Sequence, residues 1–171
     1  MATPLSSKDI EALTKSRRGS GGKRLRIFSD IFPFLAIPVL VYNFIAMSAG
    51  TSVEGGPPAM LQLVDATALT LPMISGVNLE LGWGDLLIVF AVIFLFIEVI
   101  KATSTASTGI INHMLSMFLF ILCVIEFMIF ESFATSTFFI ITMIVLLDAL
   151  AGMVVTIVSA RRDFGVEGIG A

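Results

Sequence analysis

Four ionisable side chains lie inside or at the edges of long apolar stretches of the sequence, where such groups can serve as proton or cation sites. They are Glu98, His113, Glu126 and Asp148. Asp148 stands nearest the middle of its apolar stretch, where a charge costs about 2.5–3.5 kcal/mol on insertion scales. It must therefore face protein or water, either as a proton or cation site or as the partner in a packing hydrogen bond to a neighbouring helix.

Glu126 belongs to a polar stripe along one predicted helix. The stripe repeats at intervals of three, four or seven residues and consists of Asn112, Ser116, Cys123 and Glu126. This spacing places the four residues on one helical face, which faces protein or water rather than lipid. A polar seam between helices is the preferred interpretation, and a transport path is the alternative.

Glu98 and His113 flank the predicted turn between two apolar stretches. Glu98 stands three residues before Lys101, a spacing that predicts a local ion pair with a lysine reaching toward the membrane surface. His113 lies one turn inside the next stretch, so hydrogen bonding near the interface is favoured over a role as ligand or proton relay.

Motifs for enzymatic chemistry are missing from the sequence. It contains one cysteine and one histidine, so a Cys-x-x-Cys pair and a haem held by two histidines are both excluded. There is no phosphate-binding loop, dinucleotide fingerprint or zinc signature. The sequence therefore predicts a protein that is not an enzyme and has no cofactor and no metal.

The composition predicts the elements that hold these residues. Apolar residues make up 57% of the 171 and charged residues 13%, about half the usual soluble share. We expect an all-α fold with four transmembrane helices, at about 31–49, 83–101, 110–130 and 138–160. The first stretch ends in a sequence similar to a signal-peptidase site, but the roughly thirty polar residues before it favour an uncleaved anchor.

All ten Lys and Arg residues fall on one side of the predicted membrane. They precede the first span, lie between the second and third, or follow the fourth, which predicts that both termini are cytoplasmic. The chain then divides into a basic tail at 1–30, a four-helix domain at 31–160 and a second tail at 161–171. Trp83, Lys101, Arg161 and Arg162 are the expected interface anchors.

This orientation gives each buried acid a depth. At 1.5 Å per residue, Glu126 is expected near the outer face and Asp148 near the centre. Glu98 and His113 are expected near the cytoplasmic face. The levels are about 10 Å apart, too far for direct hydrogen bonds of about 3 Å, so water or hydroxyl groups would have to bridge them.

The outer loop at 50–82 carries a hairpin pattern. Apolar and polar residues alternate in Leu69–Met73 and Val77–Leu81, on either side of Ser75-Gly76. A lone hairpin is marginally stable in water, so it should rest on the helix ends or on a partner protein.

Several segments together resemble a known group of proteins. They include Trp83-Gly-Asp85, Phe96-Ile-Glu-Val-Ile-Lys-Ala-Thr103, Asn112-His-Met-Leu-Ser116, Leu147-Asp148 and Ser159-Ala-Arg-Arg-Asp163. Over roughly residues 75–164 the chain resembles small four-helix bacterial inner-membrane proteins of no known activity. The resemblance implies a multi-pass protein of the bacterial inner membrane and transfers no functional residue.

Two functions are consistent with these features. The first is a structural or accessory subunit that packs against a larger membrane protein or against copies of itself. The alternative is a proton-coupled transporter or channel subunit that uses Asp148 with Glu126 and Glu98. Nucleic acid is not an expected partner, because the basic segment 1–30 shows no aromatic platforms.

Overall fold

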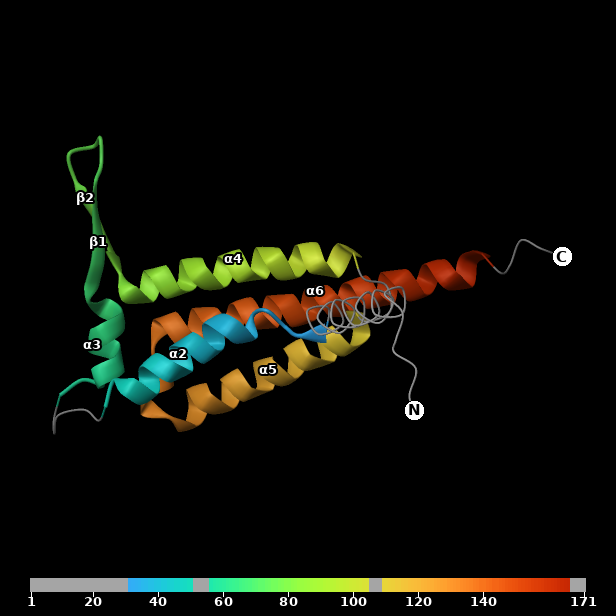
Figure 1. Cartoon of the computed structure of the whole chain (residues 1–171), viewed down its shortest axis with the longest axis horizontal. Coiled ribbons are helices and arrows are strands. Elements are labelled where there is room, and N and C mark those ends of the chain that lie inside the picture. The colour runs from blue at the N-terminus through green and yellow to red at the C-terminus, as the bar shows by residue number, and fades with distance from the viewer. Residues whose placement is uncertain (1–30, 51–55, 105–108, 167–171) are drawn as a thin grey trace, which may run out of the picture.

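A computed structural model describes residues 31–50, 56–104 and 109–166 (Figure 1). The predicted tail at 1–30 and the last five residues lie outside this part of the chain, as do the side chains of Arg161 and Arg162. In chain order the elements are α2 (Ala36–Ser48), α3 (Ala59–Asp65), β1 (Thr67–Pro72), β2 (Asn78–Gly82), α4 (Trp83–Ser104), α5 (Gly109–Ile129), the short 3-10 helix η1 (Glu131–Phe133) and α6 (Ser136–Val166).

In the part of the chain that the structure describes, three helices are long and apolar enough to cross a membrane. They are α4, α5 and α6, over Trp83–Ala102, Ile111–Ile129 and Ser136–Val154. This confirms a largely helical protein suited to lipid. At 13 residues, α2 covers only about 20 Å, so a fourth complete span remains a prediction.

Helix α6 is the central helix of the bundle. Figure 1 shows it between α4 and α5, with α2 beside them. Half of its membrane-length segment is buried, against 17% for the corresponding segments of α4 and α5. The outward faces of α4 and α5 expose large apolar side chains, including Val92, Phe96, Phe118 and Leu122. Lipid is the environment in which such faces are stable.

Helix α2 joins the bundle through Tyr42. Its fully buried ring packs on Phe133 and Phe138, with ring centres 5.6 and 4.7 Å away. Its hydroxyl is 2.6 Å from Thr135 Oγ1. Pro38 is the third residue of α2, within the first turn, where a missing N–H leaves no helical bond unmade. This position allows proline without a break in the helix.

The outer loop contains the predicted hairpin and a helix that was not predicted. Strands β1 and β2 pair antiparallel, and the turn contains Gly76 at a φ of 83°. Helix α3 precedes them and buries Met60 and Val64. Figure 1 shows α3 and the hairpin running across the helix axes at one end of the bundle, with the hairpin projecting beyond α4. We call residues 67–82 the arm.

Candidate functional site

Glu98 is the centre of a buried polar network at the end of α4. The side chain is 1% exposed, and both carboxylate oxygens are engaged. Oε2 accepts a 2.7 Å bond from the main-chain N–H of Phe34. Oε1 accepts a 2.6 Å bond from Asn112 Nδ2 and lies 2.8 Å from Lys101 Nζ. The carboxylate thus joins the segment before α2 to α4 and α5.

Lys101 turns into the protein instead of reaching toward the membrane surface. Its side chain is 10% exposed. Nζ donates to the carbonyl of Phe32 at 2.6 Å and to Asn112 Oδ1 at 2.9 Å. It also lies 4.5 Å from the centre of the Phe34 ring. The predicted i,i+3 pair with Glu98 is present, but the side chain turns inward rather than reaching outward, because these acceptors replace water around the ammonium group.

Helices α5 and α6 meet along a second polar seam next to this network. A Cβ added to Gly152 would overlap the ring of His113, so α6 can approach α5 this closely only without a side chain there. One turn along, the Ser116 hydroxyl lies beside the Asp148 carboxyl. Glu98 and Lys101 are near enough to act electrostatically on both His113 and Asp148. The structure thus gathers these predicted residues into one region.

Three buried atoms in this seam make no well-formed hydrogen bond. They are His113 Nδ1, Ser116 Oγ and Asp148 Oδ2. Ser116 and Asp148 are 1% and 4% exposed. A buried polar group without a partner costs about 1–3 kcal/mol. The seam therefore contains the groups in the described chain that most need a proton, a water molecule or a small ligand.

Glu126 lies apart from this region, toward the other end of α5. Its Oε2 accepts a 3.1 Å bond from Asn43 Nδ2, which also donates to the carbonyl of Val39. Thirteen residues separate Glu126 from His113, which is about 20 Å along a helix. Glu126 thus joins α2 to α5, and the stripe it shares with Asn112 contributes to two separate contacts between helices.

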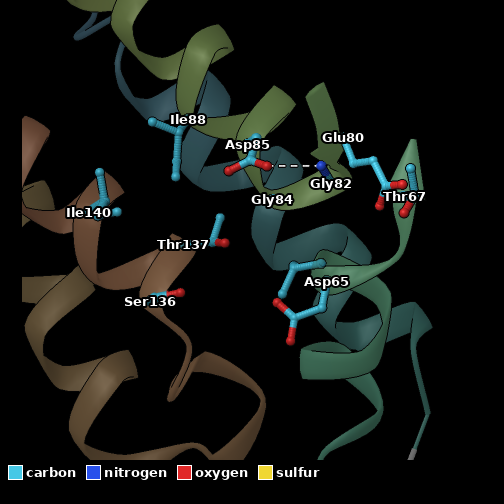
Figure 2. Close-up of a pocket in the computed structure, with 11 residues that line it drawn as sticks. Asp65, Thr67, Glu80, Gly82, Gly84, Asp85, Ile88, Ser136, Thr137 and Ile140 are labelled. Atoms are coloured by element: carbon cyan, nitrogen blue, oxygen red, sulfur yellow. Dashed lines mark hydrogen bonds between the residues drawn. The ribbon is translucent and has the colours of Figure 1, made fainter. Parts of the chain in front are cut away.

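The arm end of the bundle contains a pocket that sequence analysis missed. Figure 2 shows it between the first turn of α6, the start of α4 and the base of the arm. Its volume is about 380 Å³. The polar residues around it are Asp65, Thr67, Glu80, Asp85, Ser136 and Thr137, and the apolar residues are Val64, Ile88 and Ile140. Its acids belong to three elements, and the charge pattern of the outer loop was the only signal for it in the sequence.

One of the three acids also has a local role. Asp85 Oδ2 accepts a 2.9 Å bond from the N–H of Gly82, just before α4 (Figure 2). In the parts of the chain that the structure describes, no group of three His, Cys, Asp or Glu side chains could hold a metal ion. The acids of the pocket are therefore spread around its wall rather than gathered on one point.

Comparisons with protein-family models, with curated proteins and with solved structures found no match to this chain. The resemblance to small four-helix inner-membrane proteins therefore remains a prediction. Residues and geometry alone support the functional argument.

Proposed function

We propose that this protein is a structural or accessory subunit of a membrane complex and that it docks to a larger membrane protein through the arm. The observation that carries the proposal is a leucine face of the arm, which is exposed at Leu69, Leu71 and Leu79. Leu69 pairs with Leu81 and Leu71 with Leu79. Paired residues of antiparallel strands share a face of the sheet, so four leucines lie together.

The opposite face of the arm is polar, and the tip is apolar. Thr70 pairs with Glu80 on the polar face. Met73, Ile74 and Val77 at the turn are 51%, 108% and 67% exposed. An isolated two-stranded hairpin is marginally stable in water, and exposed apolar surface of this kind is typical of protein contacts. The leucine face and tip thus need a cover that the bundle does not provide.

The buried acids of the bundle support the same proposal. Glu98 has three donors around it, and Glu126 has Asn43. The Asn112–Glu98 and Asn43–Glu126 bonds each link two helices, and the Phe34 bond links α4 to the segment before α2, so these acids stabilise the bundle. Glu98 and Glu126 line neither the acidic pocket nor an apolar groove beside the arm. A rigid bundle with an exposed docking element is suited to assembly.

The proposed topology has four spans and cytoplasmic termini, in a bacterial inner membrane. It is supported by the base-free arm end, which carries Asp65, Glu80, Asp85 and Glu131, while Lys101 lies at the opposite end of α4. Ile74→Cys should react with a membrane-impermeant maleimide in intact spheroplasts, because the proposed orientation places the arm outside. The native Cys123 is buried and should give little background labelling. Labelling only after membrane disruption would show that the arm lies on the cytoplasmic side, contrary to the proposed orientation.

Photo-crosslinking in native membranes tests the docking. A photoreactive residue at Leu71, on the leucine face, should give one crosslinked product of defined mass. The same residue at Thr70, on the polar face of the same strand, is the matched control. A product between two copies of the chain would make the assembly a homo-oligomer. Equal and diffuse crosslinking from both positions would contradict docking through the arm.

One observation favours a second candidate, a proton-coupled transporter or channel subunit. Asp148 Oδ2, Ser116 Oγ and His113 Nδ1 make no well-formed hydrogen bond in the interior, and ionisable groups inside a membrane span mark proton paths. In proteoliposomes, Asp148→Asn should then abolish a proton flux that Glu131→Gln, an exposed change outside the bundle, preserves. Absence of flux in the unaltered protein, under either direction of pH gradient, would remove this candidate.

A further inference from the structure

The pocket at the arm end is a partly open cavity with an uncompensated negative charge. Asp65 ends α3, Glu80 stands in β2 and Asp85 in the first turn of α4, and all three line the cavity. Lys101, the basic residue of α4, is too far away to neutralise these acids. It lies eighteen residues from the start of the helix, which is about 27 Å along its axis. No basic side chain among the pocket's lining residues neutralises the acids.

Helix dipoles offset only part of this charge. Helices α4 and α6 both begin at the pocket. A helix N-terminus is equivalent to roughly half a positive charge. Two such ends supply about one charge against three carboxylates, so the cavity keeps a negative potential.

Thr137 adds an unpartnered group that faces the cavity. The residue is 5% exposed and lines the pocket, and its hydroxyl makes no hydrogen bond within the described residues. Figure 2 shows Thr137 on the α6 side, across the cavity from the base of the arm, with Asp85 between them. Gly84 holds this wall close, because a Cβ added there would overlap Thr137 Oγ1. A hydroxyl that is open to the cavity in this position is available to a ligand.

The volume of the cavity and the separation of its acids indicate which kind of cation it can bind. The described acids form no group of three that could hold a metal ion, so a bare ion would not meet all of them. A cavity of about 380 Å³ lies within the range of small-molecule sites. Ile88 and Ile140 supply an apolar side on which a short alkyl chain can pack.

We propose that this pocket binds a small organic cation in which an alkyl chain carries an ammonium or guanidinium group. Asp65 and Glu80 receive the charged end, and Thr137 accepts a hydrogen bond from it. Ile88 and Ile140 contact the alkyl chain. This inference concerns the isolated protein and is independent of docking through the arm.

Isothermal titration of the full chain in lipid nanodiscs with agmatine tests the proposal. The neutral analogue N-butylurea keeps the butyl chain and the planar shape of the guanidinium end but lacks both positive charges of agmatine, so it should bind at least tenfold more weakly. Glu80→Gln and Thr137→Val should each weaken agmatine binding about three- to tenfold, the range for one hydrogen bond to a ligand. Glu131→Gln is the matched control, because Glu131 is an exposed acid at the same end but does not line the pocket.

Three results would overturn the proposal. The first is no saturable heat with agmatine in the unaltered protein. The second is an equal loss of affinity in Glu131→Gln and Glu80→Gln, which would show diffuse attraction to an acidic surface. The third is equal binding of N-butylurea, which would remove the role of charge. Circular dichroism of each variant separates loss of binding from loss of fold.

Discussion

Removing the ammonium group of Lys101 should strongly destabilise the bundle. In Lys101→Met the Glu98 carboxylate would remain 1% exposed and lose the cation at 2.8 Å. Removing one partner of a buried ion pair costs about 3–5 kcal/mol, because the other charge is left uncompensated. The carbonyl of Phe32 and Asn112 Oδ1 would also lose their donor. We therefore expect a loss of unfolding free energy near the upper end of that range.

The double variant Glu98→Gln/Lys101→Met should recover much of this loss. A glutamine can still accept the bond from the Phe34 N–H, and the buried charge is gone. Replacing both members of a buried pair is often close to neutral. We expect the double variant to lie within about 1–2 kcal/mol of the unaltered protein, allowing one hydrogen bond to remain imperfect.

Reversible unfolding in mixed micelles of increasing SDS content, followed by far-ultraviolet circular dichroism, measures these differences. Leu147→Ala is the control, since Leu147 is 58% exposed on the outside of α6. An unfolding midpoint for Lys101→Met equal to that of the control would refute a compensated buried pair. A double variant less stable than Lys101→Met would refute the argument from uncompensated charge.

Three further changes test individual contacts of the fold. Gly152→Ala should destabilise the bundle by about 1–3 kcal/mol in the same unfolding assay, because the added Cβ would overlap the His113 ring; unchanged stability would mean that the two helices separate freely. Tyr42→Phe should cost about 1–2 kcal/mol through loss of the hydroxyl's bonds to Thr135 and to the carbonyl of Ser132, with the ring packing retained, and an unchanged midpoint would contradict a role of these bonds in holding α2. Gly76→Ala should cost about 1 kcal/mol of local arm stability, seen as faster amide hydrogen exchange in β1 and β2, because alanine is disfavoured at a φ of 83°.

The sequence predicted well those features that depend on local periodicity. The hairpin was placed correctly because alternation and a turn glycine stand side by side in the chain. The three long helices were placed within about six residues, because each contains a long apolar run that is visible in the sequence. Helix α3 was missed, because seven residues carry little periodic signal and the helix depends on burying Met60 and Val64 against other elements.

The inward turn of Lys101 could not be predicted, because it depends on where a distant segment lies. The acceptors of its ammonium group include the carbonyl of Phe32, 69 residues away. Spacing predicted the partner on the same helix, Glu98, and that pair is present. The pocket was missed on similar grounds, since Asp65 and Thr137 meet only after α3 and α6 have packed at the same end.

The carboxylates of this chain differ in how far nearby donors and cations compensate their charge, and that difference indicates where a ligand can bind. Glu98 is surrounded by low-dielectric protein and has three donors, so its charge is fully used in holding helices together. Asp65 and Glu80 stand at the edge of the bundle, where water lets a carboxylate stay unpaired until a cation arrives. Asp148 is intermediate, with Ser116 beside it and one buried oxygen unpartnered. The candidate binding site is therefore the pocket at the arm rather than the buried acids. Substitution of Asp148 distinguishes a structural bundle from a proton-conducting one.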